Sequence, residues 1–178
     1  MKIIILGIAI AAGLFLLLAC TQTTNANKNN TATQTEKLMP NLSLTDTSLT
    51  KVVKTPEEWK KLLSPFEFYV LREQGTEPAF QNAYWNNHKE GHYFCRGCHL
   101  PLFSSNTKFE SGTGWPSFFA PINKSFVKEV TDVSHGMTRG EIVCARCEGH
   151  LGHVFDDGPE PTGLRYCIDS ASLIFKDK

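Results

Sequence analysis

Two Cys-x-x-Cys pairs, Cys95/Cys98 and Cys144/Cys147, constrain the fold of this 178-residue chain more than any other feature. Four thiolates arranged in this way can surround one Zn²⁺ tetrahedrally and leave no open coordination position. Because 45 residues separate the pairs, the sequence predicts one structural zinc ion that joins two distant β segments. Disulfide bonds are the alternative in an exported protein, although a bridge within one pair closes a very small loop and stabilises little.

The amino-terminal residues predict export and a lipid anchor. Met1-Lys2 precedes an uncharged apolar run from Ile3 to Ala19, which as a helix spans only about 26 Å of a bilayer core of about 30 Å. The run ends in Leu17-Leu18-Ala19-Cys20, which resembles a bacterial lipobox. We expect residues 1–19 to be a signal peptide and Cys20 to be lipidated, with an uncleaved anchor as the alternative.

The predicted location is therefore the extracytoplasmic side of a bacterial membrane, which is the periplasmic side where a second membrane exists. Thr21 after the lipidated cysteine is compatible with sorting to the outer membrane. Residues 20–53 are rich in Thr and Asn and contain no aromatic residue, so they are predicted to form a flexible tether. Residues 54–178 are predicted to form the folded domain, which we expect to be a monomer. The formal net charge of zero argues against a nucleic-acid partner.

The predicted domain begins with two short helices. Thr55-Pro56-Glu57-Glu58 and Ser64-Pro65-Phe66-Glu67 each combine a capping residue, a proline and a Glu that closes a capping box. Trp59, Leu62 and Leu63 are expected to form a face that covers the core. Short β-like runs separated by Gly, Pro, Asn and Asp then predict an antiparallel sheet or small barrel, with strands at 92–95, 117–120, 126–133, 141–144, 164–169 and 172–175.

Cys167 is the one cysteine left without a lipid or a metal to bind. If Arg165-Tyr166-Cys167-Ile168-Asp169 is a strand, then Arg165, Cys167 and Asp169 face the same side. A neighbouring positive charge favours the thiolate, which is the reactive form of cysteine. A buried, inert cysteine is the alternative.

Two further segments suggest a site around this thiol. His150 and His153 can serve as acids or hydrogen-bond donors, or they can belong to a metal site. Trp115 stands in a glycine-rich turn, Gly112-Thr113-Gly114-Trp115, where the backbone permits close approach of a ligand and the indole face suits a thioether or methyl group.

Taken together, these segments resemble the methionine-R-sulfoxide reductases of the B class. The resemblance runs from about Thr55 to Phe175 and includes the two cysteine pairs. Its other motifs are Phe68-Tyr69-Val70, Gly75-Thr76-Glu77, Gly114-Trp115-Pro116-Ser117-Phe118, His150-Leu151-Gly152-His153-Val154-Phe155, Asp157-Gly158-Pro159 and Arg165-Tyr166-Cys167. The family implies a mainly β fold of two antiparallel sheets, zinc-stapled and Mss4-like.

The resemblance also implies a reaction and residue roles. The R epimer of methionine sulfoxide, mainly in oxidised proteins, would be reduced to methionine while the thiolate of Cys167 becomes a sulfenic acid. His150 and His153 would hold or protonate the oxygen, and Arg165 would favour the thiolate. The substrate would be bound by Trp115, which packs on its methyl group, together with Phe155 and Asp169.

This chain departs from the family at two positions. Many members carry a second reactive cysteine where this chain has Thr113, so we expect an external, thioredoxin-like thiol to reduce Cys167. Asp169 stands where the family usually has Asn, and this carboxylate can pair with Arg165. Two other functions remain as alternatives: a zinc-ribbon binding module without catalysis, and a hydrolase that uses Cys167 with His153.

Overall fold

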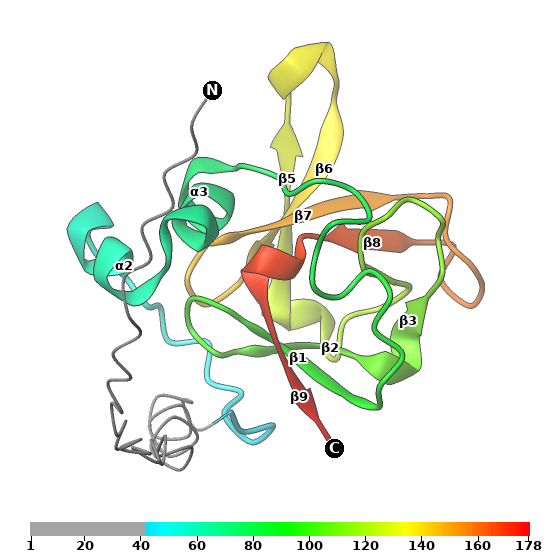
Figure 1. The fold of residues 1–178 in the computed structure, drawn as a ribbon, viewed down its shortest axis with the longest axis horizontal. Coiled ribbons are helices and arrows are strands. Elements are labelled where there is room, and N and C mark those ends of the chain that lie inside the picture. The colour runs from blue at the N-terminus through cyan, green and yellow to red at the C-terminus, as the bar shows by residue number, and fades with distance from the viewer. Residues whose placement is uncertain (1–41) are drawn as a thin grey trace, which may run out of the picture. The chain divides into compact units, whose positions relative to one another are not determined.

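The computed structural model describes residues 42–178, which form two antiparallel β-sheets and two α-helices (Figure 1). The predicted signal peptide and Cys20 lie outside the described residues. No helix within 42–178 combines the length and the apolar character needed to cross a bilayer.

Both predicted helices are present, and both begin with the predicted capping box. Helix α2 spans Pro56–Leu62 and helix α3 spans Pro65–Glu73. Thr55 and Ser64 each accept a hydrogen bond from the backbone of the Glu three residues later, whose carboxylate in turn accepts from the capping residue. The expected core face is only partly right: Trp59 and Leu63 are buried, whereas Leu62 is 60% exposed, because α2 ends there after fewer than two full turns.

The strands form a three-stranded and a six-stranded sheet. The smaller sheet has the order β2-β1-β9, and the larger has the order β3-β4-β8-β7-β6-β5. The bounds are β1 Gly91–Cys95, β2 Pro101–Ser104, β3 Lys108–Phe109, β4 Ser117–Phe118, β5 Val127–Asp132, β6 Arg139–Cys144, β7 His150–Phe155, β8 Arg165–Ile168 and β9 Leu173–Asp177. Single 3₁₀ turns occupy 105–107, 124–126, 134–136 and 170–172. The mainly β architecture is the predicted one.

All six predicted strands exist with small shifts of their ends, and three further strands were not predicted. Strand β2 begins with a proline, which removes a backbone donor and suits the edge position that β2 has in its sheet. Strand β3 has only two residues. Strand β7 contains Gly152, a residue that weakens a strand signal in sequence.

An aromatic core joins the two sheets. Phe103 of the smaller sheet stacks on Phe118 of the larger sheet, with ring centroids 4.5 Å apart. Tyr93 meets the edge of Phe118 at 5.0 Å, and all three side chains are fully buried. Such pairs add specific geometry to the gain from apolar burial, and they fix how one sheet faces the other.

Residues 42–54, which we call the N-terminal strap, pack against the rest of the domain, although the sequence predicts residues 42–53 as part of the tether. Leu42 is buried against Phe94 and Ile174, and the backbone of Val52 donates to Arg146. The Arg146 guanidinium binds the strap through the backbone of Ser48 and through both the carboxylate and the backbone of Asp46. The partners of the strap lie far along the chain, which is why its polar composition does not reveal them.

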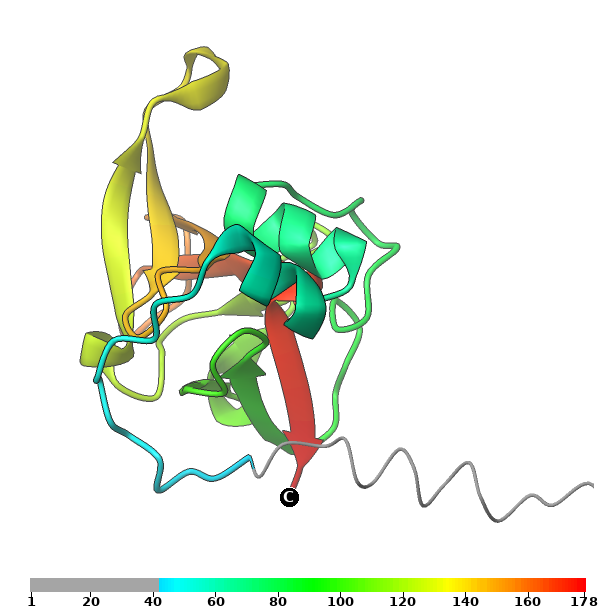
Figure 2. The same ribbon diagram turned by 90° about the vertical axis from the view of Figure 1, so that its left-hand side faces the viewer.

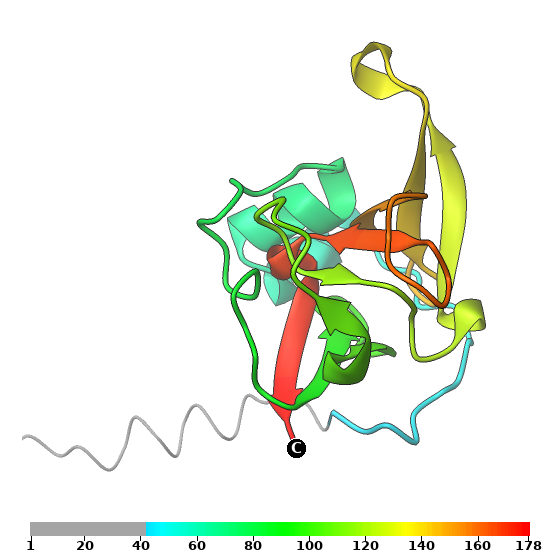
Figure 3. The ribbon, with the colours of Figure 1, turned by 90° about the vertical axis from the view of Figure 1, so that its right-hand side faces the viewer.

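The β5–β6 hairpin projects from the body of the domain, as the two side views show (Figures 2 and 3). Its tip lies on the side opposite to the C-terminus, which ends near the start of the strap. Strand β5 is an edge strand and most of its residues are exposed.

Candidate active site and metal site

The four cysteines of the two pairs meet in space. Cys95 ends β1, and Cys144 ends β6, so each pair lies in the turn that follows a strand. The Sγ atoms of Cys95 and Cys147 are 3.6 Å apart, those of Cys98 and Cys144 are 3.5 Å apart, and all four lie within 4.8 Å of one another. No described cysteine forms a disulfide, so the disulfide alternative is not supported.

This geometry fits a tetrahedral metal. Zinc–sulfur bonds of about 2.3 Å at tetrahedral angles separate the sulfurs by roughly 3.8 Å, which is close to the observed spacing. The hydrogen bond with Cys144 is the main cause that raises the pKa of both Cys95 and Cys98. Four thiolates this close therefore need a cation between them. A metal held here joins the β1–β2 turn of one sheet to the β6–β7 turn of the other.

His99, beside Cys98, is not part of the cluster. Its backbone has a φ of +62° and donates to Cys95, so the residue turns the chain directly after the first pair of ligands. The equivalent position of the second pair, Glu148, has a φ of +58° and donates to Cys144. The two turns are thus built alike.

Cys167 occupies the middle of the larger sheet. It lies in β8 between β4 and β7, opposite Ser117 on one side and His153 on the other. Residues directly opposite in an antiparallel pair project from the same face, so the sheet register itself brings an imidazole beside the thiol.

A β-bulge in β7 brings the second histidine to the same face. His150 and His153 are three residues apart and would face opposite sides of a regular strand. The β6–β7 register shifts between Ile142 and Val143, and Gly152 has a φ of +147°. The extra residue reverses the alternation, so the two imidazole rings meet at 5.4 Å in a T-shaped pair.

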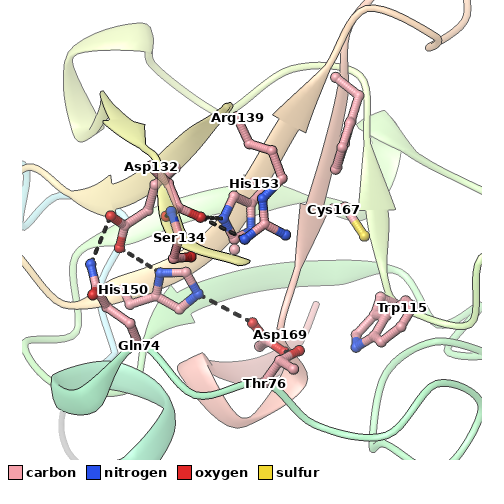
Figure 4. A pocket seen from close by; sticks show the side chains of 13 residues that line it. Gln74, Thr76, Trp115, Asp132, Ser134, Arg139, His150, His153, Cys167 and Asp169 are labelled. Atoms are coloured by element: carbon pink, nitrogen blue, oxygen red, sulfur yellow. Dashed lines mark hydrogen bonds and ion pairs between the residues drawn. The ribbon is translucent and has the colours of Figure 1, made fainter. Parts of the chain in front are cut away.

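These side chains line a pocket of about 270 Å³ (Figure 4). Of the residues predicted to form the site, six line it: Trp115, His150, His153, Phe155, Cys167 and Asp169. The other lining residues are Gln74, Thr76, Asp132, Ser134, Arg139, Glu141 and Gly152. The size suits one side chain of a substrate, and the lining combines an indole, a thiol and several proton donors.

Arg165 stands behind the pocket and does not line it. Its guanidinium binds both carboxylate oxygens of Asp157 at 2.8 Å and stacks 4.3 Å from the centroid of Phe155. The possible pairing with Asp169 is therefore wrong, because Asp157 takes that place. Arg165 orients Phe155 and brings a positive charge near Cys167, but that charge is shared with Asp157.

The balance of effects at Cys167 favours the thiol in the free protein. Burial raises the pKa of Cys167, while a hydrogen bond with Thr113 and the charge of Arg165 act in the lowering direction. Asp169 adds to the rise. The predicted effect of Arg165 thus has the right sign, but burial outweighs it.

His150 lies between two carboxylates. Its Nδ1 is 2.6 Å from Oε1 of Glu141, and its Nε2 is 3.6 Å from Oδ2 of Asp169. Burial on its own would lower the pKa of His150, but the nearby carboxylates of Asp169 and Glu141 outweigh it and raise the pKa. All three side chains are almost fully buried.

His153 has a different environment. Its Nε2 is 2.9 Å from Oδ2 of Asp132, and that oxygen also binds Arg139 at 2.6 Å. Burial lowers the pKa of His153, and the charges of Arg139 and His150 lower it further, against the opposite effect of Asp132. Hydrogen bonds from Ser134 and His153 keep the pKa of Asp132 low.

The segment Thr76-Glu77, in which Glu77 is buried, holds the other side of the pocket. The indole of Trp115 donates to the backbone oxygen of Glu77 at 3.1 Å. The Glu77 carboxylate accepts from the backbone of Ser170 and Ala171, and the Glu77 backbone donates to Asp169. Burial raises the pKa of Glu77. This residue therefore fixes both Trp115 and Asp169.

Several residues of the pocket were not predicted from the sequence. Glu141, Asp132 and Arg139 belong to the β5–β6 hairpin, and in the sequence they look like ordinary polar residues of a half-exposed strand. In the sequence, Thr76 was noted only as part of the motif Gly75-Thr76-Glu77. Strand periodicity is the sequence signal that could have grouped Arg139 with Glu141, because residues two apart share one face of a strand.

Comparison with known proteins agrees with this architecture. The model of the SelR domain family matches residues 63–177. The "Peptide methionine sulfoxide reductase MsrB" of Acinetobacter baumannii is 59% identical over 126 residues, which cover 71% of this chain and 91% of that protein. The protein of the same name from Thiobacillus denitrificans is 58% identical over 125 residues, which are 70% of this chain and 95% of that protein.

The matched region contains both cysteine pairs, the bulged histidine strand and Cys167. The agreement favours an enzyme over a zinc-ribbon binding module. The chain belongs to the SelR domain family, that of the B-class methionine sulfoxide reductases.

Proposed function

We propose that this protein reduces the R epimer of methionine sulfoxide in oxidised proteins to methionine, with Cys167 as the group that is oxidised. The observation that carries the proposal is the pocket itself, in which a lone thiol lies beside two imidazoles and an indole. Trp115 offers an aromatic face to the methyl group of the substrate, and Phe155 closes another wall. The bound zinc would hold the two sheets together and take no part in the reaction, because four sulfurs fill its coordination sphere.

In the proposed reaction, one oxygen atom moves from the substrate sulfur to the sulfur of Cys167. Cys167 loses its proton, and its sulfur attacks the sulfur of the sulfoxide while the sulfoxide oxygen accepts a proton from an imidazole. The protonated oxygen then passes to the cysteine sulfur: its bond to the substrate sulfur and the new sulfur–sulfur bond both break, a bond between the oxygen and Sγ of Cys167 forms, methionine leaves, and Cys167 is a sulfenic acid. The substrate is reduced by two electrons and Cys167 is oxidised by two.

Recycling requires an external thiol. Thr113 occupies the position beside Cys167, with its Oγ1 3.9 Å from Sγ, and the other described cysteines form the metal cluster. A thioredoxin-like dithiol would attack the sulfenic acid, release water and leave as a disulfide. The monomeric domain would need no partner subunit for either step.

The proposed location is the outer side of a bacterial membrane. The support is the sequence Leu17-Leu18-Ala19-Cys20, in which acylation of Cys20 would attach the domain by its amino-terminal end. Replacement of Cys20 by Ser should move the protein from the membrane fraction to the soluble fraction and abolish labelling with a fatty acid. A variant that stays in the membrane unlabelled would instead indicate an uncleaved anchor.

The proposed activity is tested by an assay that resolves the two epimers. The purified domain is incubated with racemic methionine sulfoxide and dithiothreitol, and the epimers are separated by chromatography. We expect only the R epimer to disappear, and we expect Cys167→Ser to abolish the reaction. Hydrolase activity or consumption of both epimers would contradict the proposal. His88→Gln, which changes an exposed imidazole outside the pocket, is the matched control and should keep full activity.

A further inference from the structure

Met137 is the only methionine within residues 42–178, and the structure leaves it open to solvent. It lies between β5 and β6, at the end of the hairpin that projects from the body of the domain (Figures 2 and 3). The residue is 48% exposed. Oxidation of methionine to the sulfoxide is a common lesion, and Met137 is the site in this part of the chain where an oxidant would cause it.

The loop that carries Met137 extends beyond the last paired residues of the hairpin. The pairing of β5 with β6 ends at Asp132 and Arg139. Gly136, beside Met137, has a φ of +70°, and a side chain at that position would meet no atom within 4 Å. Residues 133–138 contain no Asp, Glu, Lys or Arg, so this loop can enter a cavity without the cost of burying a charged side chain of its own.

The pocket of the same molecule is out of reach of Met137. Cys167, His153 and Glu141 stand opposite one another on β8, β7 and β6, so Cys167 lies roughly 10 Å from β6 across the sheet. Met137 has extended backbone and precedes Glu141 by four residues, which adds roughly 13 Å along the strand. A methionine side chain cannot span this separation, so only the pocket of a second molecule can receive the sulfur while the hairpin stays paired.

We propose that Met137, once oxidised, is a substrate of this protein itself: the R sulfoxide at Met137 of one copy enters the pocket of a second copy and is reduced there. The inference rests on the proposed function and names one of its protein substrates, a second copy of this chain. The pocket of about 270 Å³ accommodates a single side chain. The formal net charge of zero means that two copies do not repel each other through net charge.

Both steps balance in atoms and electrons. Hydrogen peroxide transfers an oxygen atom to the sulfur of Met137 and leaves as water, and the thioether loses two electrons. In the second copy the oxygen passes to Sγ of Cys167, which becomes a sulfenic acid, and Met137 regains both electrons as a thioether. The external dithiol then reduces the sulfenic acid and releases water. The net result is the reduction of peroxide by the dithiol, with Met137 restored.

The inference is tested by offering the protein its own oxidised form. The full chain carrying Cys167→Ser, which cannot reduce itself, is treated with hydrogen peroxide and then freed of it, and circular dichroism verifies that it is still folded. A small amount of unsubstituted protein is added with dithiothreitol. Trypsin releases Met137 in residues 129–139, and mass spectrometry follows the loss of its oxygen. We expect about half of the sulfoxide to disappear, because peroxide forms both epimers and a separate enzyme acts on each.

A second methionine on a helix separates presentation by the hairpin from exposure alone. Leu62 ends helix α2 and is 60% exposed, and Leu62→Met nearly conserves the side-chain volume. Placed in the same Cys167→Ser chain, its sulfoxide is released in residues 62–72 and competes with that of Met137 in a single mixture. We expect position 62 to be reduced at least about tenfold more slowly, because the packed helix keeps its sulfur from the attack distance.

Free methionine-R-sulfoxide in a parallel mixture distinguishes this inference from the proposed function. If the free sulfoxide is consumed while the sulfoxide at Met137 persists, or if positions 62 and 137 are reduced equally fast, the inference is wrong and the proposed activity stands. Resistance of Met137 to peroxide would contradict the inference in the same way. If neither sulfoxide is consumed, the proposed activity fails and the inference fails with it.

Discussion

Thr113 is the residue that most directly sets how this enzyme would be recycled. Its hydroxyl lies 3.9 Å from Sγ of Cys167 and also contacts Ser111 at 2.8 Å. A thiol at this position would lie close enough for a disulfide after modest rotation of the side chains. In the proposed cycle, Thr113 would therefore leave Cys167 without a neighbouring thiol to reduce it.

Substituting Thr113 by Cys should therefore restore an internal path. After one turnover without reductant, we expect Thr113→Cys to contain a disulfide between residues 113 and 167, seen by mass spectrometry of a non-reduced digest. Thr113→Ser, which cannot form the bond, is the control. A sulfenic acid that persists in Thr113→Cys would show that the two side chains cannot meet.

The reactivity of Cys167 should depend on pH in the direction set by burial. Because burial raises its pKa, the thiolate fraction at neutral pH is small, and the rate of alkylation by iodoacetamide should keep rising beyond the pH at which a free cysteine levels off. Arg165→Met removes a lowering influence and should move the midpoint to still higher pH. A midpoint below that of free cysteine would mean that the charge of Arg165 outweighs burial.

At the scale of elements, the site depends on departures from regular structure that sequence patterns do not encode. Short β-like runs separated by Gly, Pro, Asn and Asp were enough to predict six strands, because these residues end strands. The bulge in β7 was not predictable, since it reverses the faces of His150 and His153 without changing composition. Two of the acids beside these histidines, Asp132 and Glu141, lie on β5 and β6, and only the sheet register brings them there.

The N-terminal strap is a second element whose structure its own sequence does not predict. Its polar composition predicts a tether, but Arg146 supplies the partners. The Arg146 side chain is 6% exposed, and its guanidinium donates to the strap and to the backbone oxygen of Cys98 at 3.1 Å. One buried cation thus ties the strap to both cysteine turns.

Replacing Arg146 by Met should loosen this connection. The substitution removes five hydrogen bonds, and the acceptors at Ser48 and Cys98 lose their donor. We expect a loss of about 2–4 kcal/mol in the free energy of unfolding by urea, together with faster proteolysis within residues 42–52. Lys128→Met, at a half-exposed ion pair, should cost less than about 0.5 kcal/mol. Equal effects of the two substitutions would contradict the role of Arg146.

For the molecule as a whole, the metal cluster connects the sheets at one end and the aromatic core connects them between their faces. The order of the strands places the β1–β2 turn and the β6–β7 turn together only when both sheets are formed. The sequence predicted this cluster fully, because ligand type and spacing are local properties. The position of Cys167 relative to the cluster is a property of the complete fold.

Removal of the metal should therefore destabilise the domain without touching the reactive thiol. We expect about one zinc per chain by elemental analysis, and a fall in Tm of roughly 10 °C or more after chelation, which corresponds to several kcal/mol for a domain of this size. The alkylation rate of Cys167 in the remaining folded fraction should stay the same. A metal-free preparation that is equally stable would contradict a structural zinc site.

The central claim is that Cys167 alone receives the oxygen of the substrate, and a single turnover tests it most directly. The protein is mixed with an excess of methionine-R-sulfoxide without reductant, sulfenic acid is trapped with a dimedone reagent, and the digest is analysed by mass spectrometry. We predict one methionine released per chain, with the trap on Cys167 and on no other cysteine. A disulfide between Cys167 and a cysteine of the metal cluster, or turnover that leaves Cys167 unmodified, would contradict the account.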